Sequence, residues 1–172
     1  MLAPMDIEII RDFVSESKTI VTECLNLLES IEGNFTQVTL LETYGNNIDR
    51  IMGGAKTLSL DQSEESVLSV ISDYAAVCKN VGYKAAQITG NEAFFDICVG
   101  LLIDASEMLS RILDQAERPL AEVKKAIPDE FITRLKWVLQ QFSENIRSTV
   151  ASKPGLSQDE VSALLNRISK KI

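Results

Sequence analysis

Apolar residues recur every three or four positions along almost the whole chain, and this spacing limits the fold more than any other feature. Such spacing places apolar side chains on one face of an α-helix, whereas a half-buried strand requires strict alternation. Short polar or glycine-containing turns separate the periodic segments, and a residue of the polar break at 61–66 and Asn91 are predicted to cap the helices that follow them. Five segments are predicted to be long helices: residues 6–31, 35–59, 64–88, 91–116 and 129–147. In the first of them, the side chains predicted to face the core are Ile9, Phe13, Ile20, Cys24, Leu27 and Ile31. The sequence therefore predicts an all-α protein.

The first four of these helices, joined by short turns, are predicted to pack as an antiparallel four-helix bundle. Pro119 and Pro128 bracket a shorter segment, after which the fifth helix packs at one end or side. We therefore predict one helical domain at 1–147, a linker of small residues at 148–155, and a tethered C-terminal helix within 156–172. A chain of 172 residues is long enough for one domain with a full core.

The charge of the chain excludes two classes of partner. The 17 Lys and Arg residues against 25 Asp and Glu residues give a net charge of −8. Because no surplus of cations is present to neutralise phosphates, we expect neither nucleic acid nor an anionic membrane as partner. The N-terminus has no signal-peptide pattern, and the chain has no apolar run of about 18 residues, so we predict a cytoplasmic protein.

Three cysteines, Cys24, Cys78 and Cys98, lie far apart in apolar helical segments. The chain has no CxxC pair and no histidine, so we expect no metal site and no cofactor of its own. The thiols are predicted to be buried and reduced, as in proteins of a reducing compartment.

Residues 41–55 combine an apolar helical stripe with a neighbouring polar one. The second stripe contains Glu42, Asn46, Asp49 and Gly53. Within a helix, Gly53 and Gly54 each cost roughly 1 kcal/mol relative to Ala. We therefore expect a partner or a neighbouring helix to approach the backbone closely at these glycines.

Asp49–Ala55, Asp-Arg-Ile-Met-Gly-Gly-Ala, resembles the His-x-Ile-Lys-Gly-x-Ala signature of histidine phosphotransfer (HPt) domains, most closely those of CheA-type kinases. Residues 13–29 also resemble the first helix of these domains, with Phe followed by Glu and then a Leu-rich stretch. The resemblance implies a four-helix bundle with an added helix, over residues 6–145. Asp49 stands where the phosphorylated histidine belongs, and Met52 stands where the lysine belongs, so the chain cannot carry a phosphohistidine.

The C-terminal segment is predicted to begin a short amphipathic helix. Ser157 is the predicted N-cap, Glu160 completes a capping box, and Leu156 packs on Val161. The apolar stripe contains Val161, Leu164, Leu165 and Ile168. A tethered amphipathic helix is a common form of helix-in-groove ligand. A helix docked on its own bundle would show the same cap and stripe.

The same segment resembles the N-terminal peptide of FliM-type flagellar switch proteins, Leu-Ser-Gln-x-Glu-Ile-Asp-Ala-Leu-Leu, which binds phosphorylated CheY. Val161 is a conservative change from this pattern, and Ser162 is a departure. The resemblance favours the tethered ligand over the docked helix. The CheY-binding residues that it implies are Leu156, Ser157, Gln158, Asp159, Glu160, Val161, Ala163, Leu164, Leu165 and Asn166.

A chain without histidine can still act on a phosphorylated receiver domain. Hydrolysis of an aspartyl phosphate requires a water in line with the phosphorus, and the receiver itself supplies Mg²⁺ and a lysine. A partner need only add an amide, which orients the water, and an acid, which holds the lysine. CheZ-type phosphatases supply an acid and a Gln four residues later on a helix, and CheC-type phosphatases supply Glu and Asn. Glu42 and Asn46 are the only pair here with the acid four residues before the amide. Glu23 and Asn26 are a weaker pair, and a solvated helix flank is the alternative for Glu42 and Asn46.

The two resemblances together imply a chemotaxis signalling protein that binds phosphorylated CheY-type response regulators. We predict that Glu42 and Asn46 accelerate dephosphorylation, that Asp49, Arg50 and Gly53 contact the receiver, and that the only metal is the Mg²⁺ of the receiver. The alternative function is a non-catalytic adaptor or sink for phosphorylated receivers. A plain helical bundle whose tail folds back would require both resemblances to be accidental.

Overall fold

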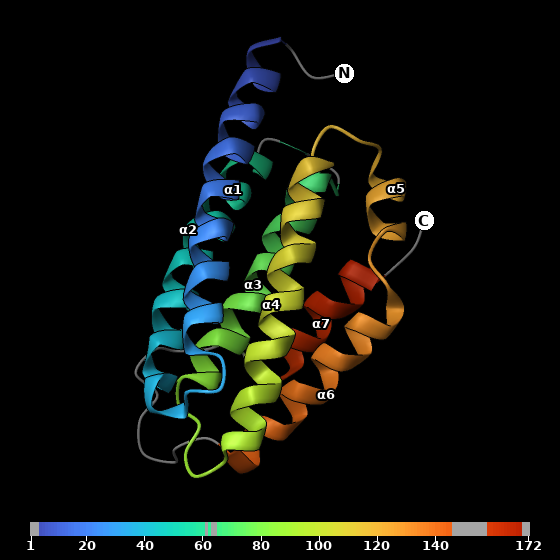
Figure 1. The fold of residues 1–172 in the computed structure, drawn as a ribbon. Coiled ribbons are helices and arrows are strands. Elements are labelled where there is room, and N and C mark those ends of the chain that lie inside the picture. The colour runs from blue at the N-terminus through green and yellow to red at the C-terminus, as the bar shows by residue number, and fades with distance from the viewer. Residues whose placement is uncertain (1–3, 61, 63–64, 146–157, 170–172) are drawn as a thin grey trace.

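The computed structural model describes residues 4–60, 62, 65–145 and 158–169 of the chain. In this part of the chain seven α-helices and one 3₁₀-helix are present, and no β-strand (Figure 1). The all-α prediction is confirmed. None of the helices found there is both long and apolar enough to cross a membrane.

The helices follow the predicted segments. Their bounds are Pro4–Ile31 (α1), Leu41–Ser59 (α2), Val67–Ala85 (α3), Glu92–Asp114 (α4), Leu120–Lys125 (α5), Asp129–Asn145 (α6) and Gln158–Ser169 (α7). The predicted helix at 35–59 differs, because its first six residues form a separate 3₁₀-helix, η1 (Phe35–Leu40). Three β-branched residues in η1, Thr36, Val38 and Thr39, weaken α-helix propensity there, and 3₁₀ turns are frequent at helix starts.

Side-chain caps set the starts of α3 and α4. The Ser66 hydroxyl accepts a hydrogen bond from the Ser69 backbone N–H at 3.2 Å, and the Ser69 hydroxyl accepts one from the Ser66 N–H at 2.9 Å. Asn91 Oδ1 likewise accepts from the Phe94 N–H at 3.0 Å. The predicted caps at the polar break before α3 and at Asn91 are therefore confirmed. Gly33, at a φ of 72°, follows the end of α1 in the left-handed region.

Helices α1 to α4 pack in cyclic order, each against two neighbours: α1 on α2, α2 on α3, α3 on α4 and α4 on α1. Successive helices run in opposite directions (Figure 1). We call these four helices the four-helix core. Its largest fully buried side chains include Tyr44, Tyr74 and Phe95. The Tyr44 and Ser106 hydroxyls hydrogen-bond at 2.9 Å, which joins α2 to α4.

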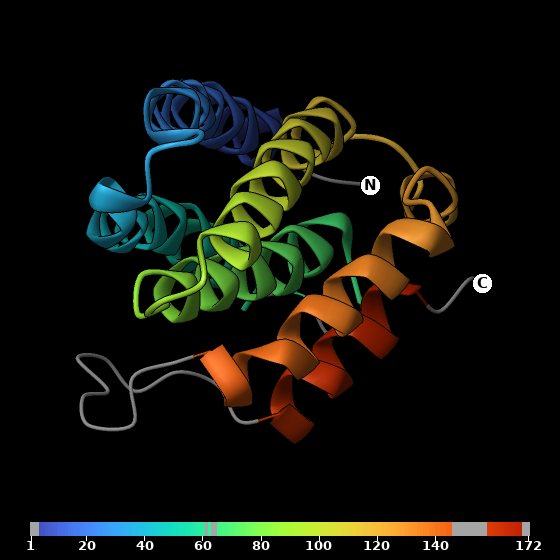
Figure 2. The ribbon, with the colours of Figure 1, turned by 60° about the horizontal axis from the view of Figure 1, so that its bottom comes forward.

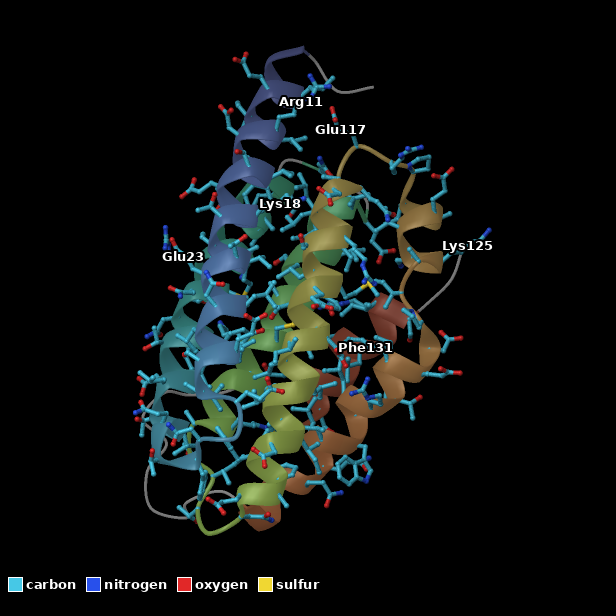
Figure 3. The ribbon with its side chains drawn as sticks, viewed as in Figure 1. Arg11, Lys18, Glu23, Glu117, Lys125 and Phe131 are labelled. Carbon is cyan, nitrogen blue, oxygen red and sulfur yellow. The ribbon has the colours of Figure 1, made fainter. Side chains whose placement is uncertain are left out.

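Helices α6 and α7 lie side by side along one side of the four-helix core (Figure 2). Helix α6 contacts α3 and α4, and α7 contacts α3 and α6. Two aromatic pairs join α6 to the core: Phe131 stacks with Tyr74 at a centroid distance of 6.4 Å, and Phe142 meets Phe94 edge-on at 5.4 Å. Figure 3 shows Phe131 between α6 and the core.

The predicted inward positions are buried with few exceptions, and the clearest exception is at the start of α1. Ile9 is 46% exposed, whereas its neighbour Ile10 is 5% exposed. The buried stripe of α1 runs through Ile10, Ser17 and Val21, and Ile9 lies about 100° away from Ile10 around the helix. Ile9 was therefore assigned to the wrong side of the stripe.

Two ion pairs hold α1 to the end of α4. Arg11 meets Glu117 at 3.0 Å, and Lys18 pairs with Asp114 (Figure 3). All four side chains are substantially exposed, so each pair contributes at most about 1 kcal/mol.

Candidate functional site

The predicted site residues of the central stretch lie on α2. Asn46, Asp49 and Arg50 are exposed, and Glu42 and Gly53 are half-buried. Glu42, Asn46, Asp49 and Gly53 are spaced by three or four residues, so they share one side of the helix. Side chains of α3 contact this side, whereas Arg50 is directed towards α1, where it meets Glu16 at 3.7 Å. The Arg50 pair is well exposed and adds little stability.

The amide of Asn46 is held by a tyrosine of α3. The Tyr83 hydroxyl donates a hydrogen bond to Asn46 Oδ1 at 2.8 Å. Burial raises the pKa of Tyr83, and the nearby charges of Asp49 and Glu42 raise it further. The hydroxyl therefore stays protonated at neutral pH and remains a donor. This bond fixes the orientation of the amide beside Glu42 and Asp49.

Glycines on both helices permit the close approach of α2 and α3. The Tyr83 ring lies directly over Gly45, and the Tyr44 ring lies over Gly82. A Cβ at position 82 would come within 2.7 Å of Tyr44 Cδ1, and a Cβ at position 45 would overlap the Tyr83 ring. The two Tyr–Gly contacts are reciprocal, so they set the position of Tyr83 relative to Asn46.

Asp49 is paired with a lysine of α3. Lys79 Nζ lies 3.0 Å from Asp49 Oδ1. The Asp49 side chain is half exposed, and the Lys79 side chain is 21% exposed. An approaching phosphoryl group would therefore meet an ammonium beside the carboxylate, which reduces the electrostatic repulsion that Asp49 alone would cause.

The two adjacent glycines of α2 have different surroundings. A Cβ at Gly54 would lie 2.9 Å from the Phe13 ring of α1, so Gly54 permits close packing of α1 on α2. A Cβ at Gly53 would meet no atom within 4 Å. Close packing of a neighbouring helix therefore applies to Gly54, whereas the surface over Gly53 is open.

Sequence reasoning missed Lys79 and Tyr83, which contact Asp49 and Asn46 respectively. One signal could have indicated Tyr83: the dipeptide Tyr44-Gly45 in the second predicted helix is mirrored by Gly82-Tyr83 in the third. Lys79 and Tyr83 are also four residues apart, so they lie on one face of α3. The rival acid–amide pair, Glu23 and Asn26, is exposed on α1, with Glu23 on its outer side (Figure 3).

The C-terminal segment is helical from Gln158, and its predicted apolar stripe is buried against α3 and α6. The four buried side chains are Val161, Leu164, Leu165 and Ile168. Asp159, Glu160, Ala163 and Asn166 are exposed. The structure has the docked arrangement, which the cap and stripe alone predicted as well as the tethered one, and not the tethered arrangement that the resemblance favoured. The predicted linker at 148–155, Leu156 and the Ser157 N-cap with its capping box lie outside the described residues.

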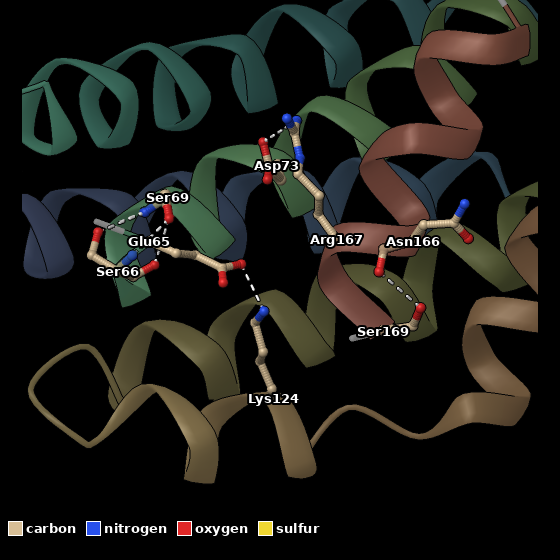
Figure 4. A network of polar contacts seen from close by, with 8 residues as sticks. All are labelled: Glu65, Ser66, Ser69, Asp73, Lys124, Asn166, Arg167 and Ser169. Atoms are coloured by element: carbon tan, nitrogen blue, oxygen red, sulfur yellow. Dashed lines mark hydrogen bonds and ion pairs between the residues drawn. The ribbon is translucent and has the colours of Figure 1, made fainter. Parts of the chain in front are cut away.

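Polar contacts surround the docked helix (Figure 4). Arg167 Nη2 lies 3.1 Å from Asp73 Oδ1 of α3, and Lys136 of α6 donates to Asn166 Oδ1 at 3.3 Å. Burial raises the pKa of Asp73, and the Arg167 charge lowers it by a smaller amount. Nearby, the buried Lys124 of α5 meets Glu65 at 2.6 Å.

A groove of about 560 Å³ lies between α2, α3 and α7. Its lining mixes apolar and charged side chains, namely Met52, Lys56, Ser59, Leu60, Ser69, Ser72, Asp73, Ala76, Glu160, Ala163, Leu164 and Arg167. On α2, Lys56 follows Asp49 and Gly53 at helical spacing, so the groove continues along the side that carries the candidate site.

The three thiols, Cys24, Cys78 and Cys98, are buried and form no disulfide, as predicted. Burial raises the pKa of each thiol to about 12, so none is a nucleophile at neutral pH. Among the described residues no cluster of three His, Cys, Asp or Glu side chains could hold a metal ion. Comparison of the chain with protein-family models, curated proteins and solved structures finds no match.

Proposed function

We propose that this chain is a chemotaxis signalling protein that binds phosphorylated CheY-type receiver domains and accelerates loss of their aspartyl phosphate. The observation that carries the proposal is the segment Leu156–Asn166, which resembles a CheY-binding peptide. From Gln158 the segment belongs to a 12-residue helix with a single apolar face. A short helix of this form is suited to bind a groove on a partner.

The arrangement of α1 to α4 supports the HPt-like part of the proposal. Four successive helices alternate in direction and pack in cyclic order, as the HPt resemblance implies. Asp49, in the position of the HPt histidine, is exposed on α2. A receiver that docked there as on an HPt domain would meet Asn46, Asp49 and Gly53 together.

The proposed reaction is hydrolysis of the phosphoryl–carboxylate bond of the receiver. A water attacks the phosphorus, the bond to the aspartyl oxygen breaks, inorganic phosphate leaves, and the proton of the water passes to solvent. The Asn46 amide, held by Tyr83, orients the water, and the Glu42 carboxylate holds the lysine of the receiver. The Mg²⁺ of the receiver neutralises charge on the phosphoryl oxygens.

A non-catalytic adaptor is the second candidate, and the Asp49–Lys79 pair favours it. Lys79 Nζ and Asp49 Oδ1 are 3.0 Å apart, so the pair offers both signs of charge to a docked receiver. Such a surface would hold a receiver through polar contacts without orienting a water.

Binding of a receiver by the full chain and by a chain that ends at residue 155 tests the proposal. The receiver is a CheY-type domain of the same organism, kept phosphorylated with acetyl phosphate and Mg²⁺. We expect the full chain to bind the phosphorylated form, and the truncated chain to bind it at least about tenfold more weakly, because the tethered segment supplies the effective concentration. Circular dichroism of the truncated chain serves as the folding control. Equal binding by both chains, or binding that ignores phosphorylation, would contradict the proposal.

A further inference from the structure

The four apolar side chains that would bind a partner already have a partner within the chain. Val161, Leu165 and Ile168 are each 1% exposed, and Leu164 is 8% exposed. The rest of α7 is mainly polar, so this stripe is its one apolar face. A groove on a receiver and the surface of α3 and α6 would therefore require the same side chains, and α7 cannot satisfy both at once.

The docked position is specific rather than a general apolar contact. On α6, Leu139 and Lys136 line a cavity of about 230 Å³ with Val161 and Leu165. Beside this cavity, Lys136 Nζ donates a hydrogen bond to Asn166 Oδ1 at 3.3 Å. This bond and the burial of Val161 and Leu165 define the side of α7 that faces α6.

On α3, one ion pair fixes the other side of the helix. Asp73 meets Arg167 at 3.1 Å (Figure 4). Ala76 lines the groove beside Leu164. Asp73 belongs to the core, whereas Arg167 lies just outside the resemblance to the CheY-binding peptide, which ends at Asn166. A substitution at Asp73 can therefore weaken the docking of α7 without changing the sequence of the peptide.

Helix α7 also lies next to the candidate site. On α3, Ser72, Ala76, Lys79 and Tyr83 are spaced by three or four residues, so they form one stripe. The first two line the groove beside α7, and the last two hold Asp49 and Asn46. Docked α7 therefore flanks one end of the α2–α3 surface on which a receiver would dock.

We propose that α7 is a latch with two mutually exclusive partners, its own groove on α3 and α6 and the phosphorylated receiver. This inference rests on the proposed function. When a receiver captures α7, the helix leaves its groove, and the end of the α2–α3 surface beside the candidate site becomes accessible. The apparent affinity of the full chain for the receiver is reduced by the fraction of molecules in which α7 is undocked.

The first test compares a synthetic peptide of residues 156–172 with the full chain, both titrated with the phosphorylated receiver. We expect the observed association rate of the peptide to rise linearly with receiver concentration, and that of the full chain to level off at the rate at which α7 leaves its groove. A linear rise for both would overturn the latch and leave the proposed function intact. If neither peptide nor chain binds, the proposed function fails, and the latch fails with it.

The second test uses Asp73→Lys, which places a cation opposite Arg167 and leaves the peptide unchanged. We expect amide hydrogen exchange in α7 to accelerate about tenfold or more, and the affinity of the full chain for the receiver to rise about tenfold over that of the wild type. An unchanged unfolding midpoint for the core would show that the variant is folded. Unchanged exchange in α7 together with unchanged affinity would overturn the latch.

The matched control adds Arg167→Asp to Asp73→Lys, which restores the ion pair with reversed charges. We expect slow exchange in α7 and weak receiver binding to return in this double variant. A peptide that carries only Arg167→Asp corrects for any direct effect on receiver binding. If the double variant behaves like Asp73→Lys while that peptide binds normally, the Asp73–Arg167 contact does not hold the latch.

Discussion

Asn46 gains its position from a residue on another helix. Its amide oxygen accepts a hydrogen bond from Tyr83, and the Tyr83 ring can lie close to α2 because residue 45 is glycine. At this scale the candidate site is a set of side chains whose orientation depends on the contact between α2 and α3. Single substitutions can therefore test the orientation of the Asn46 amide separately from its presence.

Tyr83→Phe removes the hydroxyl and keeps the ring over Gly45. We expect hydrolysis of the receiver phosphate to slow by about tenfold, because the Asn46 amide loses its fixed orientation. Receiver affinity should change little, and the free energy of unfolding should fall by no more than about 1.5 kcal/mol. Single-turnover phosphate release and a binding titration check the two expectations. Unchanged release would show that the hydroxyl does not position Asn46.

Two glycine substitutions form a matched pair. Gly53→Ala should raise the free energy of unfolding by up to about 1 kcal/mol, because a methyl group there meets no atom and Ala favours the helix. Gly82→Ala should lower it by about 1–3 kcal/mol, because the methyl group displaces the buried Tyr44 ring. Urea unfolding measures both. A loss of stability in Gly53→Ala would mean that the surface around Gly53 is not open.

At the scale of elements, one ion pair joins the docked α7 to α3. Asp73 is partly buried beside Arg167, with Glu65 and Lys124 also contributing to its electrostatic environment. Burial raises the pKa of Asp73 above its ordinary value of 3.8, and Arg167 compensates only in part. Ionisation of Asp73 is therefore less favourable in the folded chain than in the unfolded chain.

This shift gives the folding stability a defined dependence on pH. Because the pKa of Asp73 is higher in the folded chain than in the unfolded chain, its contribution to stability is greatest below the unfolded pKa and falls as the pH rises through the folded pKa. We expect the free energy of unfolding of the wild type, measured relative to Asp73→Asn, to increase as the pH falls from about 7 to about 4. Urea titrations at several pH values measure this difference. A difference that decreases on acidification would contradict the raised pKa.

At the scale of the whole molecule, the core joins helices through fully buried groups. Cys24 on α1, Cys78 on α3 and Cys98 on α4 are all inaccessible, and each has a pKa of about 12. Their reactivity therefore reports on opening of the core rather than on local surface chemistry.

We expect the three thiols of the native chain to react with a disulfide reagent only as fast as the core opens. In denaturant all three should react at once, and the native rate should follow the free energy of unfolding across a urea series. Spectrophotometric titration of released thiolate measures both rates. Fast reaction of one thiol in the native chain would show that the four-helix core is open at that position.

Sequence periodicity predicted the helices well because burial of an apolar stripe decides which residues face the core. It assigned Ile9 to the wrong side of α1, since a shift of one residue turns the side chain by about 100°. It could not identify Tyr83 and Lys79 as partners of Asn46 and Asp49, because those contacts depend on how α3 lies against α2. Periodicity also could not decide whether α7 docks on its own chain, because the same apolar stripe suits a groove on α3 and α6 and a groove on a partner.

The most direct test of the central claim is release of inorganic phosphate from a phosphorylated CheY-type receiver with Mg²⁺, measured with and without this protein. We expect the wild type and Asn26→Ala to accelerate release alike, and Asn46→Ala to lose about a hundredfold or more of the acceleration while it still binds the receiver. Acceleration that survives in Asn46→Ala would move the site away from α2. If the wild type binds the receiver but does not accelerate release, catalysis is contradicted and the non-catalytic adaptor is the remaining function.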